Sequence, residues 1–220
     1  KQKPRMPLLS ISGVTKAFSI RSAGLLSRNQ DMVRAVNEVS FKIDAGTCLG
    51  LVGESGCGKT TLSKIVMKAL SPDKGQLTYN DEDGAVDLLK LKGQELINFR
   101  KKIQFIFQDP FSSLNPRMTV FDIISEPLLI HKIGDQSYRN DLVKDLIQLV
   151  GLDIRHLSRF PHSFSGGQRQ RIGIARALAL RPRLLICDEP VSALDVSIQA
   201  QVLNLLKDLK ERLNLTYLFI

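Results

Sequence analysis

A glycine-rich run at residues 53–60 has the composition of a phosphate-binding loop. Its sequence, Gly53-Glu54-Ser55-Gly56-Cys57-Gly58-Lys59-Thr60, follows the pattern G-x-x-x-x-G-K-[ST]. Glycines let the backbone curl so that successive N–H groups point inward, and the N-terminus of a following helix adds positive charge. We predict that this run and Thr61 bind nucleotide phosphates, with Lys59 on the β- and γ-phosphates and the Thr60 hydroxyl on Mg²⁺. The alternative is a glycine-rich turn with a solvated lysine.

Two neighbouring carboxylates, Asp188 and Glu189, follow the apolar run at residues 184–187. A phosphate site needs a carboxylate that holds the metal, and we predict this role for Asp188. Because side chains alternate along an extended chain, Glu189 is expected to point elsewhere and to act as general base on the attacking water. Taken alone, the pair could simply end a strand. The glycine-rich run in the same chain favours function.

The run Phe164-Ser165-Gly166-Gly167-Gln168 opens a predicted helix and could form a second anion site. A serine hydroxyl and free N–H groups at a helix N-terminus can bind a phosphate. The alternative is an ordinary N-cap at Ser165 followed by flexible glycines. That alternative explains the serine but not the whole run, so we favour phosphate binding.

The elements around these motifs predict an α/β fold. Short apolar runs typical of parallel strands buried on both faces lie at residues 103–107, 184–187 and 217–220, and a similar run at 48–52 enters the glycine-rich loop. Helical periodicity is found at residues 59–70, 139–150, 168–180 and 199–213. Two β-like runs, 8–20 and 33–43, indicate an antiparallel edge with a loop between them at residues 21–31.

Residues 111–164 have helical periodicity but no core strand, and Pro116, Pro127 and Pro161 are expected to break it. We therefore predict one domain over residues 1–220. Its α/β core would comprise residues 1–110, including the antiparallel part, and residues 165–220. Residues 111–164 would form an inserted, mostly helical subdomain.

These motifs together resemble the nucleotide-binding domain of ABC ATPases, which has a P-loop NTPase (RecA-like) core. Residues 164–168 resemble the LSGGQ signature, with Phe164 in place of the leading leucine. The resemblance implies ATP and Mg²⁺ as cofactors, Gln108 as the glutamine that contacts Mg²⁺ and the attacking water, and Asp195 in a D-loop, Ser192-Ala193-Leu194-Asp195. Phe18 resembles the aromatic residue that stacks on adenine, although a core position would also suit it.

The same resemblance implies a head-to-tail dimer with an identical or paralogous ATPase, in which the signature of one chain completes the site of the other. The run from Gln108 to Arg117 and the loop before residue 33 are similar to ATPases of bacterial oligopeptide and dipeptide importers. That similarity implies transmembrane permease partners, an extracytoplasmic solute-binding protein acting indirectly, and a peripheral location on the cytoplasmic face of the inner membrane. Phe111, Leu114 and Met118 would suit a docking surface, with core packing as the alternative.

Composition is consistent with this interpretation. The 220 residues carry a net charge of +9, spread along the chain, so a solvated basic surface is favoured over a nucleic-acid surface. Three cysteines without a CxxC pair favour reduced thiols over a disulfide framework or zinc site. Apolar runs are too short to span a membrane, and no signal peptide is recognised. No nucleic-acid partner is therefore expected.

Two other classes of function compete with transport. One is an ABC ATPase that acts on nucleic acid or ribosomes, for which the chain has neither sustained heptads nor metal-spaced cysteines. The other is a nucleotide-binding module without turnover, which Glu189 argues against. The sequence starts at Lys1 without a methionine, which suggests an artificial boundary or an internal segment, and it ends at Ile220 before the family's switch histidine. Residues 1–220 are thus expected to lack the end of the core and to hydrolyse ATP poorly.

Overall fold

The computed structural model describes residues 6–21, 30–81 and 84–220, and the chain divides into two compact units at residues 97 and 98. Each unit is described by itself. Most of the loop expected at residues 21–31 lies outside the described residues. The predicted α/β class with one antiparallel and one parallel sheet is confirmed.

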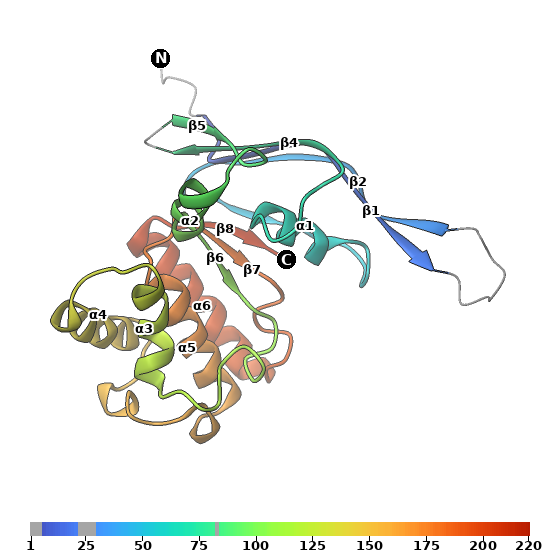
Figure 1. The fold of residues 1–220 in the computed structure, drawn as a ribbon. Coiled ribbons are helices and arrows are strands. Elements are labelled where there is room, and N and C mark those ends of the chain that lie inside the picture. Colours follow the sequence, from blue (N-terminus) through green and yellow to red (C-terminus); the bar gives the residue numbers. More distant parts are fainter. Residues whose placement is uncertain (1–5, 22–29, 82–83) are drawn as a thin grey trace, which may run out of the picture. The chain divides into compact units, whose positions relative to one another are not determined.

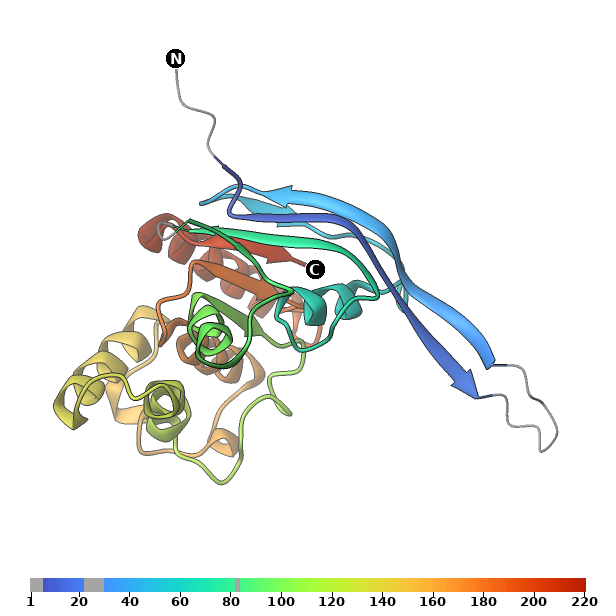
Figure 2. The same cartoon turned by 45° about the horizontal axis from the view of Figure 1, so that its top comes forward.

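Unit 1 is built on an antiparallel sheet with the strand order β2-β1-β4-β5. Its strands are β1 (Leu9–Arg21), β2 (Gln30–Ile43), β4 (Lys74–Asp81) and β5 (Gly84–Asp87). Strands β1 and β2 form the long, curved pair in Figure 2. Alternate residues such as Leu9, Ile11 and Leu77 are buried, which is the pattern of a sheet with one covered face. Strands β4 and β5 were not predicted from the sequence.

The short strand β3 (Cys48–Gly50) and helix α1 (Lys59–Val66) enclose the glycine-rich run. Both elements are shorter than the expected ranges 48–52 and 59–70, while the order of strand, loop and helix is as predicted. Leu62, Ile65 and Val66 are buried on one side of α1. Helix α2 (Gly93–Lys102), which was also not predicted, crosses the boundary between the units.

Unit 2 contains three parallel strands in the order β8-β7-β6. They are β6 (Ile103–Ile106), β7 (Leu184–Cys187) and β8 (Thr216–Phe219), which confirms the three predicted runs. Every residue of β7 is buried, as expected for the central strand of a parallel sheet covered on both faces. The polar residues that follow β7 are therefore at the carboxyl edge of this sheet.

The helices of unit 2 are α3 (Val120–Ile130), α4 (Gln136–Leu149), α5 (Gly166–Leu178) and α6 (Val196–Leu213). The last three confirm the predicted helical ranges to within a few residues. Helices α3 and α4 pack on α5 and on each other (Figure 1). Residues 111–164 otherwise form turns and the short 3-10 helices η1 (Ile154–His156) and η2 (Pro161–Ser163), and no strand is described in this segment.

Pro127 was expected to break the helical pattern, and this expectation was wrong because Pro127 lies inside α3. An interior proline removes one backbone hydrogen bond and costs about 3 kcal/mol. A capping box between Thr119 and Asp122 and the buried side chains Ile124 and Leu128 offset that cost. Pro161, by contrast, starts η2, where its missing N–H is harmless.

Candidate nucleotide-binding and hydrolysis site

The phosphate loop (residues 53–60) leads into helix α1, whose N-terminus has no side-chain cap. Gly58 is the N-cap of α1, adopts a left-handed conformation with φ of 100°, and provides no side-chain hydrogen bond. The first N–H groups of a helix have no partner within that helix. The beginning of α1 therefore offers donors and the positive end of the helix dipole to an anion.

Gly58 is required by space as well as by conformation. A Cβ atom at this position would collide with the main-chain carbonyl of Ala35 on β2. A Cβ at Gly53 would lie 2.7 Å from the Cys57 sulfur, which could move aside. Strand β2 thus approaches the loop so closely that only glycine fits at residue 58.

The side chain of Lys59 folds back onto the first residues of the phosphate loop. Its Nζ donates hydrogen bonds to the carbonyl oxygens of Gly53 and Glu54, both at 2.7 Å, and lies 3.8 Å from the Cys57 sulfur. These contacts place the ammonium group in the concave side of the loop. Thr60 and Thr61 follow in the first turn of α1.

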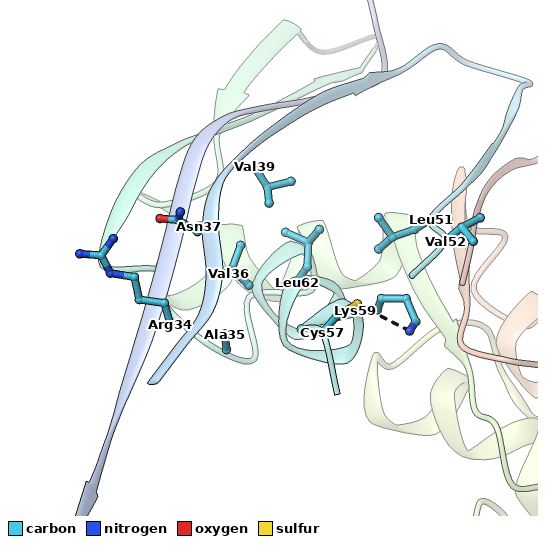
Figure 3. A pocket seen from close by; sticks show the side chains of 11 residues that line it. Arg34, Ala35, Val36, Asn37, Val39, Leu51, Val52, Cys57, Lys59 and Leu62 are labelled. Atoms are coloured by element: carbon cyan, nitrogen blue, oxygen red, sulfur yellow. Dashed lines mark hydrogen bonds between the residues drawn. The ribbon is translucent and has the colours of Figure 1, made fainter. Parts of the chain in front are cut away.

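A pocket of about 350 Å³ lies beside the phosphate loop in unit 1. Figure 3 shows the side chains around it; the lining residues are Arg34, Ala35, Val36, Asn37, Val39, Leu51, Val52, Cys57, Gly58, Lys59 and Leu62. The volume is within the range of small-molecule sites, about 300–1,000 Å³. The phosphate loop thus adjoins a pocket whose lining is partly apolar and partly polar, which is a suitable arrangement for a nucleotide.

Phe18 does not line this pocket. It is 41% exposed on β1, opposite Val33 of β2, and its ring centroid is 5.7 Å from the Lys16 ammonium. Arg34, the residue after Val33 on β2, does line the pocket. Stacking of Phe18 on adenine stays a prediction.

The carboxylates at the end of β7 have different surroundings. Asp188 is buried, and its N–H extends the strand pairing to Ile106 O at 3.0 Å. Glu189 adopts a left-handed backbone with φ of 43°, and its N–H donates to Ile220 O at 3.0 Å. The reasoning from alternation assumed an extended chain at this pair, and that assumption was wrong because the backbone of Glu189 lies in the left-handed region.

Gln108 contacts Glu189 directly. Its Nε2 donates to Glu189 Oε2 at 2.6 Å and lies 3.4 Å from Ser192 Oγ. The Ser192 hydroxyl in turn donates to the carbonyl oxygen of Glu189 at 3.1 Å. Unit 2 thus brings together Gln108 and Glu189, which were both predicted as site residues, and Ser192, which was predicted only as part of the D-loop.

Asp109 fixes the turn that follows Gln108. Its carboxylate accepts the N–H of Phe111 at 2.7 Å. This hydrogen bond, followed by one from the Ser112 hydroxyl, holds the pKa of Asp109 below its ordinary value. The ionised form therefore stabilises the turn, because stabilising hydrogen bonds are made to the charged carboxylate.

The signature run (residues 164–168) begins α5 with a capping box. Ser165 Oγ accepts from Gln168 N at 3.4 Å, and Gln168 Oε1 accepts from Ser165 N at 3.1 Å. The helix-cap alternative thus describes what Ser165 does within the chain. Contact of Ser165 with a phosphate stays a prediction, since it requires a second chain.

The two signature glycines have a packing role that the sequence did not reveal. A Cβ at Gly167 would collide with Cγ2 of Ile198 in α6, and one at Gly166 would lie 3.1 Å from a methyl carbon of Leu194. Asp195 is the N-cap residue of α6 but makes no capping hydrogen bond with its side chain. The D-loop and the signature run are therefore in close contact within unit 2.

The three cysteines are free thiols, with Cys48 and Cys57 exposed and Cys187 buried. Within residues 6–21, 30–81 and 84–220, no helix is both long and apolar enough to cross a lipid bilayer.

Comparison with known families agrees with the geometry of both units. A family model described as ABC transporter matches residues 36–192. The chain belongs to the ABC transporter family. This membership confirms the resemblance inferred from the motifs.

Curated ABC relatives are similar over nearly all of this chain. The oligopeptide transport ATP-binding protein OppF of Streptococcus mutans is 51% identical over 217 residues, covering 98% of this chain and 67% of its own length. The oligopeptide transport ATP-binding protein AppF of Bacillus subtilis is 51% identical over 214 residues, which cover 97% of this chain and 64% of the AppF chain. The OppF protein of Bacillus subtilis is 53% identical over 189 residues, which cover 86% of this chain and 61% of the OppF chain. The chain thus spans 61% to 67% of the length of these three relatives.

Solved ABC structures share the fold. The ATP-binding cassette MJ0796, in a dimeric post-hydrolysis state bound to ADP and Pi, has a TM-score of 0.78 and 28% identity over 96% of this chain and 86% of that one. The cbiO1 protein of Clostridium perfringens, part of the transporter complex cbiONQ, has a TM-score of 0.77, and the match covers 97% of this chain and 77% of the cbiO1 chain. At 22% identity, cbiO1 supports the fold alone.

Proposed function

We propose that this chain binds and hydrolyses ATP to drive import of peptides or similar small solutes. The phosphate loop carries the proposal, because a glycine-capped helix N-terminus with Lys59 in its concave side suits a triphosphate. The adjoining pocket of about 350 Å³ would take the nucleoside. The relatives named above are oligopeptide transport ATP-binding proteins, which supports peptides as the solute class.

Hydrolysis would proceed by attack of water on the γ-phosphorus in line with the bond to the β–γ bridging oxygen. Glu189 would accept a proton from the water as its oxygen bonds to phosphorus, and the bridging oxygen would leave with ADP. Gln108, 2.6 Å from the Glu189 carboxylate, would orient that water. Lys59 and the α1 N-terminus would stabilise the negative charge on the phosphates.

The predicted metal ligands suit Mg²⁺. Asp188 offers a buried carboxylate and Thr60 a hydroxyl, and both are the oxygen donors that this ion prefers. Gln108 turns its amide nitrogen to Glu189, which leaves the amide oxygen as the donor for a metal. When bound, Mg²⁺ neutralises charge on the β- and γ-phosphates.

Two such chains, identical or paralogous, would form a head-to-tail dimer in which the signature run of one completes the site of the other. The dimeric MJ0796 cassette supports this proposal. The capping box already uses the N–H groups of Ser165 and Gln168, so the N–H groups of Gly166 and Gly167 would be the backbone donors for a partner's γ-phosphate. Ser165 to Gln168 and Asp195 would thus act across the dimer.

The other partners would be transmembrane permease subunits on the cytoplasmic face of the inner membrane, with a solute-binding protein acting through them. Phe107 and Phe111 are 49% and 54% exposed beside Gln108 and could form part of the docking surface. Leu114 and Met118, which were considered for the same role, are instead buried or packed against the core of unit 2.

The decisive experiment measures ATP affinity and turnover for full-length Lys59→Ala in the presence of Mg²⁺. Loss of the ammonium group should weaken ATP binding by about 2–5 kcal/mol and abolish turnover. Lys64→Ala is the matched control, because it removes an equal charge from the exposed side of the same helix. Unchanged ATP affinity in Lys59→Ala would contradict the proposal. Peptide uptake by membranes that contain the assembled permease tests the solute class.

A further inference from the structure

One buried polar side chain of α5 is not explained by helix capping or by the roles assigned above. Gln170 is only 2% exposed. Its Nε2 donates to the carbonyl oxygen of Pro190 at 2.7 Å and to that of Phe107 at 3.4 Å. Burying an amide is unfavourable unless its hydrogen bonds are satisfied, so a residue that merely filled space would be better apolar.

The two acceptors of Gln170 belong to residues that adjoin the reactive pair. Phe107 directly precedes Gln108, and Pro190 directly follows Glu189. The primary amide has two N–H donors, which is the number needed to bond both carbonyl groups at once. The side chain of Gln170 therefore links the two backbones that carry Gln108 and Glu189.

Regular pairing between these backbones ends just before the pair. The last main-chain bond between them runs from Asp188 N to Ile106 O at 3.0 Å, and beyond it the chain turns at Glu189 with φ of 43°. From there the described hydrogen bonds that link the two segments come from side chains: Gln108 bonds to Glu189 and lies near Ser192, and Gln170 bonds to both carbonyl groups. The amide of Gln170 thus takes the place of the next bond of the ladder.

We propose that Gln170 is a positioning residue for hydrolysis, which fixes the separation of the Phe107 and Pro190 carbonyl groups and so sets the Gln108–Glu189 contact. This inference rests on the proposed ATPase function. Gln170 touches neither nucleotide nor water in this role. Its effect should therefore fall on kcat and not on the KM for ATP, because it acts through the pair that orients and deprotonates the water.

Gln170→Met in the full-length protein tests this role, because methionine keeps nearly the same volume but removes both donors. We expect kcat to fall by about 10- to 100-fold, since small misplacements of reacting groups have effects of that size. The KM for ATP should change little. Arg171→Met is the control: Arg171 lies on the same helix and donates to Val150 O at 2.8 Å, away from the pair, so its loss should lower stability and leave kcat unchanged.

A double-mutant cycle separates positioning from a purely structural role. In a Gln108→Ala background the Gln108–Glu189 contact is already lost, so adding Gln170→Met should reduce kcat little further. Equal costs in both backgrounds, or wild-type kcat in Gln170→Met, would overturn the positioning role. Should Gln170→Met fail to fold, Gln170→Asn serves in the same cycle, because it keeps one amide but is too short to bond both carbonyl groups.

The outcomes also separate this inference from the proposed function. A parent protein without Lys59-dependent ATP hydrolysis would overturn both. A parent protein that hydrolyses ATP, together with a Gln170→Met variant of unchanged kcat, would overturn the positioning role alone.

Discussion

The phosphate loop and the Gln108–Glu189 pair reach the geometry proposed for their functions in different ways. The loop is a continuous run of residues, and Lys59 bonds to carbonyl groups only five and six positions away. Gln108 and Glu189 are 81 positions apart and meet only because β6 and β7 are neighbours in one sheet. A local site depends on backbone conformation at its glycines, whereas the pair depends on the packing of unit 2. Binding and turnover should therefore be separable by mutation.

The sharpest test of this separation is Glu189→Gln. Removing the carboxylate proposed as general base should lower kcat by about 10²- to 10⁴-fold, while ATP affinity is retained because the phosphate loop is unchanged. Turnover and nucleotide affinity are measured on the same preparation. Glu211→Gln, at an exposed position of α6, is the charge control. A parallel loss of affinity and turnover in Glu189→Gln would show that the two regions are not separable.

Gly58→Ala tests the claim that the loop depends on backbone conformation. The left-handed φ alone should cost about 1–3 kcal/mol, and the collision with Ala35 O should add to it, so both ATP affinity and unfolding free energy should fall. Gly56→Ala is the matched comparison, because Gly56 also has positive φ, of 80°, but no atom lies within 4 Å of the added carbon. Its cost should be limited to about 1–2 kcal/mol. Equal losses in the two variants would eliminate the steric contribution.

Gly167→Ala probes packing in unit 2. The added methyl group would press against Ile198, and overpacking of this kind costs about 1–3 kcal/mol. Gly173→Ala lies on the same helix with open space around it, so alanine should instead stabilise the helix by about 0.5–1 kcal/mol. Urea unfolding of both variants measures the difference. Stabilisation of Gly167→Ala would contradict the close packing.

The smallest expected effect is a pH dependence in unit 2 that the phosphate loop does not share. Burial, followed by the nearby charge of Lys101, lowers the pKa of His131. The unfolded chain therefore takes up a proton at higher pH than the folded one, so stability should fall as pH drops below the ordinary histidine value of about 6.5. Unfolding free energies from pH 7.5 down to about 5 should show a shallower slope in His131→Gln than in the parent. An identical slope would contradict the prediction.

The same contrast explains which features could be predicted from the sequence. The phosphate loop and the buried run of β7 are specified by neighbouring residues, so their existence and order were predictable. The contact of Gln170 with Phe107 and Pro190 joins residues 63 and 20 positions apart, and no local pattern announces it. The turn at Glu189 was missed because local periodicity continues a strand, whereas the backbone enters the left-handed region. Pro127 was misjudged because tertiary burial outweighed its local cost.

The contact between Gly167 and Ile198 has a mechanical consequence. A methyl group added at Gly167 would collide with Ile198, so the start of α5 has little room to move toward the start of α6. Ser165 and Asp195 directly precede these two helices, so we expect a displacement of one helix start toward the other to displace both. The signature run and the D-loop should therefore move together.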